Sequence, residues 1–102
     1  MGERNQSMPK FSPRLLRTES TAAKGRRKWR VLLYNNNFHR LEDVVTWLQR
    51  STGCAADFAV EICEVCQEDG RSVCYQGSRA KCHEVAATLR LRGLQVEVDD
   101  YL

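Results

Sequence analysis

The pattern of hydrophobic and polar positions changes at about residue 28. Beyond it, stretches of period two, typical of strands, alternate with stretches in which apolar residues recur every three or four positions, typical of amphipathic helices. Turn-forming residues separate these stretches. The pattern predicts six elements in the order β-α-α-β-α-β: a strand from Lys28 to Tyr34, a helix from Leu41 to Gly53, a helix from Ala55 to Glu68, a strand from Arg71 to Gln76, a helix from Ser78 to Gly93 and a strand from Leu94 to Asp99.

Each predicted helix carries one apolar face. In the first, Leu41, Val44, Val45 and Leu48 follow the i, i+3, i+4, i+7 spacing, and Gly53 is a typical helix stop. The other two helices repeat this spacing at Phe58, Ile62, Val65 and Cys66 and at Cys82, Val85, Ala86 and Leu89. Three such helices packed on a three-stranded antiparallel sheet would form a small α/β sandwich, of the α+β type, with one core.

The first 27 residues contain few apolar side chains, two prolines and no hydrophobic period. Such a segment buries too little surface to offset its ordering entropy. We expect residues 1–27 to be a flexible basic extension and residues 28–102 to form the folded domain. A domain of about 70 residues is near the lower limit for a self-supporting core. It has room for a binding module, whereas an enzyme with cofactor and substrate pockets would be cramped.

Charge is distributed unevenly along the chain. Residues 1–30 carry nine Lys and Arg against two glutamates, whereas the remaining residues carry seven basic and eleven acidic groups. Domains that bind nucleic acid usually concentrate positive charge on one face of the fold. This acidic domain is therefore expected to have no nucleic-acid partner. The basic run from Lys24 to Lys28 is interpreted as a solvated tail, with contact to nucleic acid or acidic lipid as the alternative.

The number of cysteines and the lengths of the apolar runs indicate in which compartment the protein is expected. No run has the length of a secretory signal or of the roughly 20 residues that span a bilayer. We therefore expect no membrane partner. An odd number of cysteines, five here, favours reduced thiols and hence a cytoplasmic protein. The plastid stroma is the alternative location if the N-terminal extension is a targeting segment.

Two cysteines three residues apart, Cys63 and Cys66, have a spacing that can bind zinc. The other ligands would have to come from cysteines or histidines that have no recognised spacing, so two buried thiols are favoured. With five cysteines and two histidines, a Cys–His pair suggestive of catalysis also arises by chance. We expect no metal, no cofactor and no enzymatic activity.

The run from Trp29 to Phe38, followed by Leu41 to Val45, resembles the opening of the core of the ClpS family, the adaptors of ATP-dependent Clp proteases. The similarity continues through Ala59 to Gly70 and at Leu89 to Leu94, and covers about residues 28–99. It implies a monomer with a fold close to the C-terminal domain of ribosomal protein L7/L12.

The resemblance also implies a function. Family members bind the N-terminal residue of a substrate protein, usually Leu, Phe, Tyr or Trp, and deliver the substrate to a Clp ATPase of the ClpA or ClpC type by docking on its N-terminal domain. A chain terminus needs converging hydrogen-bond acceptors for its ammonium and a dry concavity for its side chain. Carried over by position, the family's substrate-binding residues are Asn35, Asn36, Asn37, His39, Leu41, Val44, Cys63, Cys66, Gln67 and Leu94.

The sequence departs from the family inside this site. Asn36 replaces the usual Asp and Gln67 the usual His, and neutral amides bind an ammonium less strongly than a carboxylate does. When protonated, His39, which with Arg40 replaces a common Thr-Pro pair, would repel the ammonium. Cys63 and Cys66 are smaller than the usual residues, which suggests a roomier pocket that favours aromatic side chains.

Three other interpretations remain open. The asparagines could form only a turn. The chain could be a regulator that binds the ATPase but has lost recognition of N-terminal degrons. It could also be a small module associated with the ribosome or with nucleic acid, as the fold resemblance and the basic extension suggest.

Overall fold

The computed structural model describes residues 11–14 and 28–101. The elements follow the predicted order and are β1 (Lys28–Tyr34), α1 (Leu41–Thr52), α2 (Ala56–Asp69), β2 (Arg71–Gly77), α3 (Arg79–Leu91) and β3 (Val96–Tyr101). Within these ranges, no helix is long and apolar enough to cross a membrane.

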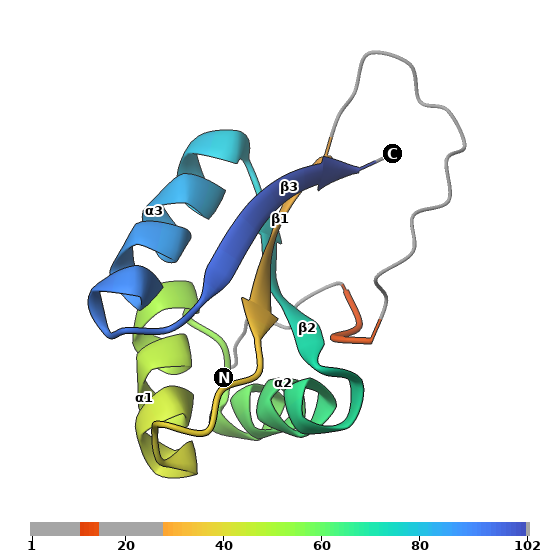
Figure 1. Cartoon of the computed structure of the whole chain (residues 1–102). Helices are drawn as coiled ribbons and strands as arrows, with labels where there is room; N and C mark the ends of the chain where they lie inside the picture. The colour runs from red at the N-terminus through yellow and green to blue at the C-terminus, as the bar shows by residue number, and fades with distance from the viewer. Residues whose placement is uncertain (1–10, 15–27, 102) are drawn as a thin grey trace, which may run out of the picture.

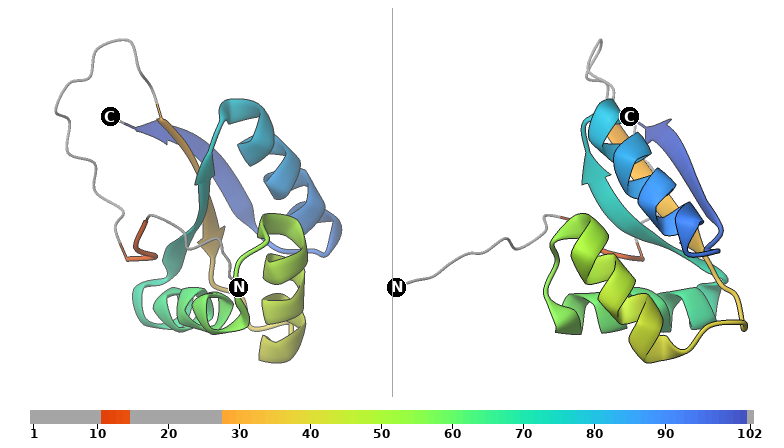
Figure 2. Two further views of the ribbon diagram at one scale, coloured as in Figure 1. Left: turned by 180° about the vertical axis from the view of Figure 1, so that it is seen from behind. Right: turned by 90° about the vertical axis from the view of Figure 1, so that its left-hand side faces the viewer.

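The sheet has the strand order β2-β1-β3, and β1 pairs antiparallel with both neighbours. Helix α3 runs along one face of this sheet, while α1 and α2 pack against each other near the end of β1 (Figures 1 and 2). The predicted sandwich of three helices and a three-stranded antiparallel sheet is confirmed.

The core lies between the sheet and the helices. It includes Val31 and Leu33 of β1, together with Leu48, Ile62 and Leu89, one from each helix, and all five are almost completely buried. These are positions at which the sequence periods predicted inward-facing side chains. Burying one such side chain contributes roughly 1.5–3 kcal/mol, so the core is the main source of stability.

Two predicted helix boundaries have the expected local chemistry. At the start of α3, the Ser78 side chain accepts a hydrogen bond from the Lys81 backbone N–H at 3.1 Å. At the end of α1, Gly53 adopts a φ of 81° and its N–H donates to the Gln49 carbonyl at 2.8 Å. A left-handed φ of this kind favours glycine.

The last strand has one polar face, as its alternation predicts. Val96 is buried and Glu97 is exposed. Asp99 lies opposite Arg30 in the register and accepts a hydrogen bond from Arg30 Nε at 2.9 Å. The Arg30 side chain is 8% exposed, so this ion pair neutralises a cation that the sheet largely removes from water.

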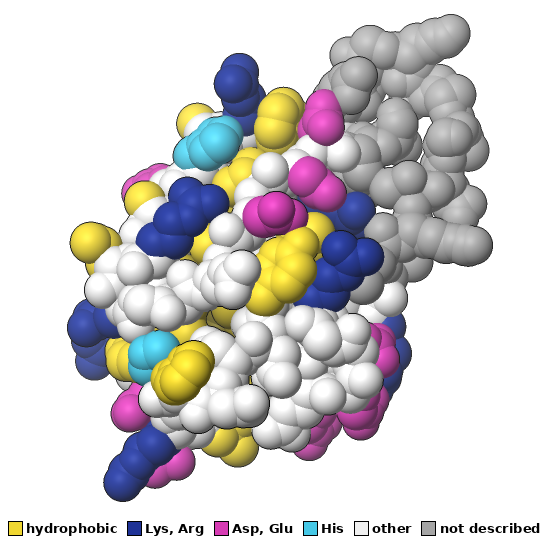
Figure 3. Space-filling view, in the orientation of Figure 1, with side chains coloured by type: hydrophobic (Ala, Val, Ile, Leu, Met, Phe, Trp, Pro, Cys, Tyr) yellow, Lys and Arg dark blue, Asp and Glu magenta, His cyan; other side chains and the backbone are white. Residues whose placement is uncertain are grey.

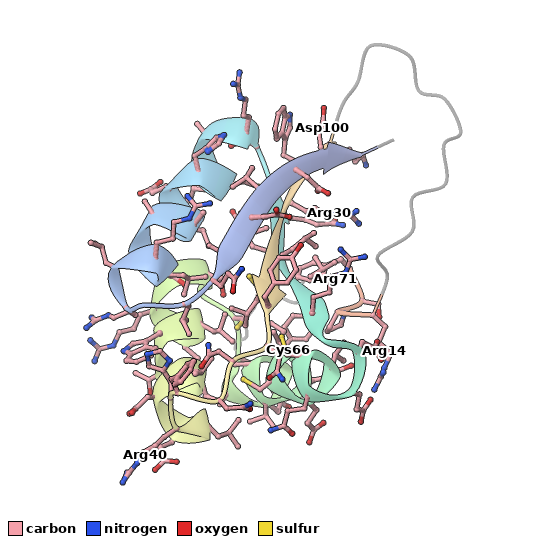
Figure 4. The ribbon with its side chains drawn as sticks, in the orientation of Figure 1. Arg14, Arg30, Arg40, Cys66, Arg71 and Asp100 are labelled. Atoms are coloured by element: carbon pink, nitrogen blue, oxygen red, sulfur yellow. The ribbon has the colours of Figure 1, made fainter. Side chains whose placement is uncertain are left out.

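A short segment of the N-terminal extension, Phe11–Arg14, contacts the domain, and we call it the anchor segment. The Pro13 carbonyl accepts a hydrogen bond from the Val73 N–H at 3.1 Å on the edge strand β2. Phe11 meets Phe58 of α2 edge to face, with ring centroids 5.4 Å apart. Arg14, beside the end of α2 in Figure 4, forms an ion pair with Glu68 at 2.8 Å. The rest of the extension predicted to be flexible lies outside the described residues.

Replacing Phe11→Ala should lower the free energy of unfolding by about 1 kcal/mol, because an edge-to-face aromatic pair contributes roughly that much beyond its buried area. Urea denaturation of the full chain measures this change. Phe38→Ala is the matched control, since the Phe38 side chain is 89% exposed and its loss should have little effect. Equal midpoints for Phe11→Ala and the unmodified chain would contradict the anchoring role of Phe11.

Candidate functional site

A pocket opens where the end of β1 and the following turn meet α1 and α2. Its walls come from three parts of the chain that are far apart in sequence, residues 33–44, 63–67 and 94. The lining residues are Leu33, Tyr34, Asn35, Asn36, His39, Leu41, Val44, Cys63, Cys66, Gln67 and Leu94.

The floor of the pocket is apolar. Leu33, Cys63, Cys66 and Leu94 are each between 3% and 7% exposed. Cys66 belongs to α2 and faces the end of β1 (Figure 4). Its thiol donates a hydrogen bond to the Leu33 carbonyl at 3.2 Å. A free thiol in such surroundings packs as a small hydrophobic group.

The two thiols of the floor are weak acids here. Burial raises the pKa of Cys63 to about 11 and that of Cys66 to about 12. Both therefore stay protonated near neutral pH, whereas nucleophilic attack and metal binding require a thiolate. No three metal-binding side chains gather within residues 11–14 and 28–101. These two residues thus give the pocket shape and apolar surface.

Backbone hydrogen bonds fix the start of the asparagine turn. The Tyr34 N–H donates to the Gln95 carbonyl and the Asn35 N–H donates to the Gly70 carbonyl, each at 2.9 Å. Gly70 ends α2 and Gln95 immediately precedes β3. The turn is therefore held at two elements and keeps one position relative to the α2 wall of the pocket.

Asn36 determines the shape of the turn itself. Its side-chain Oδ1 accepts hydrogen bonds from the Phe38 backbone N–H at 3.0 Å and from His39 Nδ1 at 3.1 Å. Because the backbone N–H can only donate, the atom facing it must be the amide oxygen. His39 Nδ1 consequently carries a hydrogen. Both lone pairs of Oδ1 are occupied within the protein.

His39 connects the turn to two other elements. Its ring meets Trp47 of α1 edge to face at 5.3 Å. On the other side, a Cβ placed on Gly93 would lie 3.4 Å from His39 Nε2. Since Gly93 also has a φ of 83°, this position combines a tight approach with a backbone conformation suited to glycine. His39 therefore forms a fixed part of the pocket wall.

The structure brings together all but one of the residues predicted for the site. Asn37 is the exception, because it is exposed on the turn and does not line the pocket. The other nine lie around one concavity, with Asn35 and Gln67 exposed at its rim. Whether they bind a substrate stays a prediction.

Two lining residues, Leu33 and Tyr34, were not predicted. Their strand pattern assigned them to the sheet, and both indeed belong to β1. Tyr34 also donates its hydroxyl to Glu97 at 2.8 Å, across the polar face of the sheet. Their position directly before the asparagine turn could have indicated that they line the pocket. A pocket under a turn also borders the residues that lead into that turn.

The site thus combines an apolar floor with a rim of neutral amides. Such a site can recognise a group by shape and hydrogen bonds, and the pKa values of its thiols favour no nucleophilic chemistry. Fold and site together fit a small binding domain.

The family of this domain follows from its sequence. Residues 24–97 match the family model described as ATP-dependent Clp protease adaptor protein ClpS. The chain belongs to the ClpS family and is therefore an adaptor-type protein of the Clp protease system. No curated protein matches it at a significant level.

A solved structure supports the same fold. The chain is similar to Agrobacterium tumefaciens ClpS2 bound to L-phenylalaninamide, with a TM-score of 0.61 and 18% sequence identity. The match covers 72% of this chain and 96% of that chain. At this identity the likeness establishes the fold alone. The ligand of this chain has to be inferred from the chain's own residues.

Alkylation by iodoacetamide should distinguish the floor thiols from a reactive pair. At pH 8 only about one thiol in a thousand is ionised when the pKa is about 11, so Cys63 should react slowly and Cys66 more slowly still. Each rate should rise about tenfold per pH unit up to that pKa. Mass spectrometry of digested samples reports each position.

The partly exposed Cys54 should be modified first, and the urea-unfolded chain provides the reference for full accessibility. Alkylation of Cys63 at pH 8 as fast as in the unfolded chain would contradict the assignment of an apolar, protonated floor.

Proposed function

We propose that this chain binds the first residue of substrate proteins in the asparagine-rimmed pocket and delivers those proteins to a Clp ATPase. The observation that carries the proposal is the combination of a buried apolar floor with neutral amides at one rim. A terminal side chain would enter the floor while the main-chain atoms of the terminus meet the amides.

The free energy that distinguishes one terminal residue from another comes from burying its side chain against the apolar floor. Burying a Leu or Phe side chain contributes on the order of 1.5–3 kcal/mol, which separates large apolar residues from Ala without any covalent step. Cys63 and Cys66 are compact side chains, so the pocket is expected to favour Phe and Trp over Leu. The family membership supports this role, since ClpS proteins are adaptors of Clp proteases.

Delivery requires a second surface. We propose docking on the N-terminal domain of a ClpA- or ClpC-type ATPase, which would place the bound substrate close to the pore and raise its effective concentration there. A pull-down with the purified full chain, scored for such an ATPase, tests this part separately from substrate binding.

A regulator that binds the ATPase without recognising substrates is the second candidate. It is favoured by one observation, that the Asn36 oxygen is already used by Phe38 and His39. Capture of the ATPase combined with no binding of any peptide would support this candidate over the first.

The face of the domain in Figure 3 gives the nucleic-acid interpretation no support. On the face in Figure 3, Lys and Arg are interspersed with Asp and Glu and form no continuous basic area. An electrostatic footprint for a phosphate backbone would need such an area.

Peptides that differ only in their first residue test the binding role. Fluorescence anisotropy with Phe, Trp, Leu and Ala at that position should give tighter binding for Phe and Trp than for Leu, and the weakest for Ala. Tighter binding of the Leu peptide than of the Phe and Trp peptides would contradict the aromatic preference. Equal binding of all four peptides would contradict the proposed pocket.

Leu41→Gln provides the variant for this assay, because Leu41 lines the pocket yet is 50% exposed and its replacement should not disturb the fold. Losing its apolar contact should weaken Phe-peptide binding about fivefold. Leu91→Gln is the matched control, since Leu91 is 85% exposed and lies outside the pocket lining.

A further inference from the structure

We propose that the free edge of β2 and the adjoining helix α2 form a second binding site, which we call the edge groove. It takes an extended segment of a partner protein that has an aromatic residue, a proline and an arginine at positions i, i+2 and i+3. In this chain the anchor segment occupies the groove, and the partner segment displaces it. None of the residues that make these contacts lines the asparagine-rimmed pocket, so the inference goes beyond the proposed function.

The proline position is set by backbone hydrogen bonding. Strand β2 is an edge strand of the described sheet, so one of its sides pairs with no other strand there. On the anchor segment, the Pro13 carbonyl accepts from the Val73 N–H at 3.1 Å and lies 3.3 Å from the Ser72 hydroxyl. All three residues are completely buried. Proline suits this place because it has no backbone N–H that would lose its hydrogen-bond partner on burial.

The aromatic position is set by α2. Phe11 meets Phe58 edge to face at 5.4 Å, and both rings are half-buried. Ser12, between Phe11 and Pro13, is exposed and meets no group of β2 or α2 that would select a side chain there. Extended segments at a sheet edge are commonly recognised in this way, with main-chain bonds for affinity and separate side-chain contacts for specificity.

The arginine position is set by charge. Helix α2 carries five acidic residues and no basic one. Arg14 lies beside the end of this helix (Figure 4) and forms ion pairs with Glu68 at 2.8 Å and with Asp69 at 3.8 Å. The C-terminal end of a helix dipole also favours a cation. The groove is therefore complementary to a basic segment.

The anchor segment is a replaceable occupant of the groove. The groups that receive it belong to β2 and α2, beside which it lies in Figures 1 and 2. Its ion pair with Glu68 is half exposed, and such pairs contribute little to stability. Attachment to the same chain, however, holds the anchor near the groove at a high effective concentration. A separate segment therefore binds well only when it is abundant or when the anchor is weakened.

A synthetic peptide with the sequence of residues 9–16 tests the groove. The peptide is labelled and acetylated, so that it presents no free terminus to the pocket. In the released chain, the full chain with Phe11→Ala and Arg14→Ala, the anchor competes less. Fluorescence anisotropy should show at least tenfold tighter binding to the released chain than to the unmodified chain. A peptide with the same residues in scrambled order should not bind.

A charge exchange tests the arginine position. Adding Glu68→Arg to the released chain should weaken binding of the peptide about fivefold, because it replaces an attraction by a repulsion. A peptide carrying Arg14→Glu should regain affinity for that variant. Glu64→Arg is the matched control, since Glu64 is exposed on the same helix and forms no printed ion pair with Arg14, and it should change the affinity by less than about twofold.

The outcomes are distinguishable from those of the pocket. Equal affinity for the unmodified and released chains, or no binding to a released chain that thermal unfolding shows to be folded, would overturn the edge groove. Arg14→Ala alone provides the same comparison in a milder variant, since its side chain is half exposed. Equal effects of Glu64→Arg and Glu68→Arg would overturn the arginine position. A dimeric unmodified chain in size-exclusion chromatography would overturn the partner protein in favour of a second copy. Leu41→Gln should leave binding of this peptide unchanged.

Discussion

A single amide oxygen, Asn36 Oδ1, fixes the turn that borders the pocket. It accepts one bond from the backbone of the turn and one from His39, which in turn packs on Trp47 and approaches Gly93. Through these contacts the turn, α1 and the loop before β3 keep one arrangement. This arrangement places the turn beside the apolar floor of the pocket. The same two bonds occupy the oxygen of that amide within the protein.

The fold could be predicted almost completely from the sequence, because each element carries its own periodic signal. Val31 and Leu33 alternate, Leu48 and Leu89 belong to helical faces, and all four are buried where those periods place them. The element bounds differ from the predicted ones by one or two residues, as at Val96, where β3 begins. In a domain of this size, local pattern and global packing agree, which leaves few competing arrangements.

The residues that line the pocket could be predicted for a different reason. Spacing alone could not distinguish a ligand-binding turn from an ordinary one, so the family resemblance supplied its residues. It did not supply atomic orientation. Asn36 was expected to accept a ligand's hydrogen bonds, and within the protein its oxygen accepts from the Phe38 N–H. Asn37 lies outside the lining for a related reason, since a tight turn directs neighbouring side chains to different sides. The orientation of these side chains depends on individual hydrogen bonds, which the hydrophobic pattern of a sequence does not reveal.

The contact between the anchor segment and β2 has a mechanical consequence for the extension. A pull on the chain ahead of Phe11 loads the hydrogen bond between Pro13 and Val73 before any tension reaches β1. The anchor segment therefore takes up such a load first, at the edge strand of the sheet.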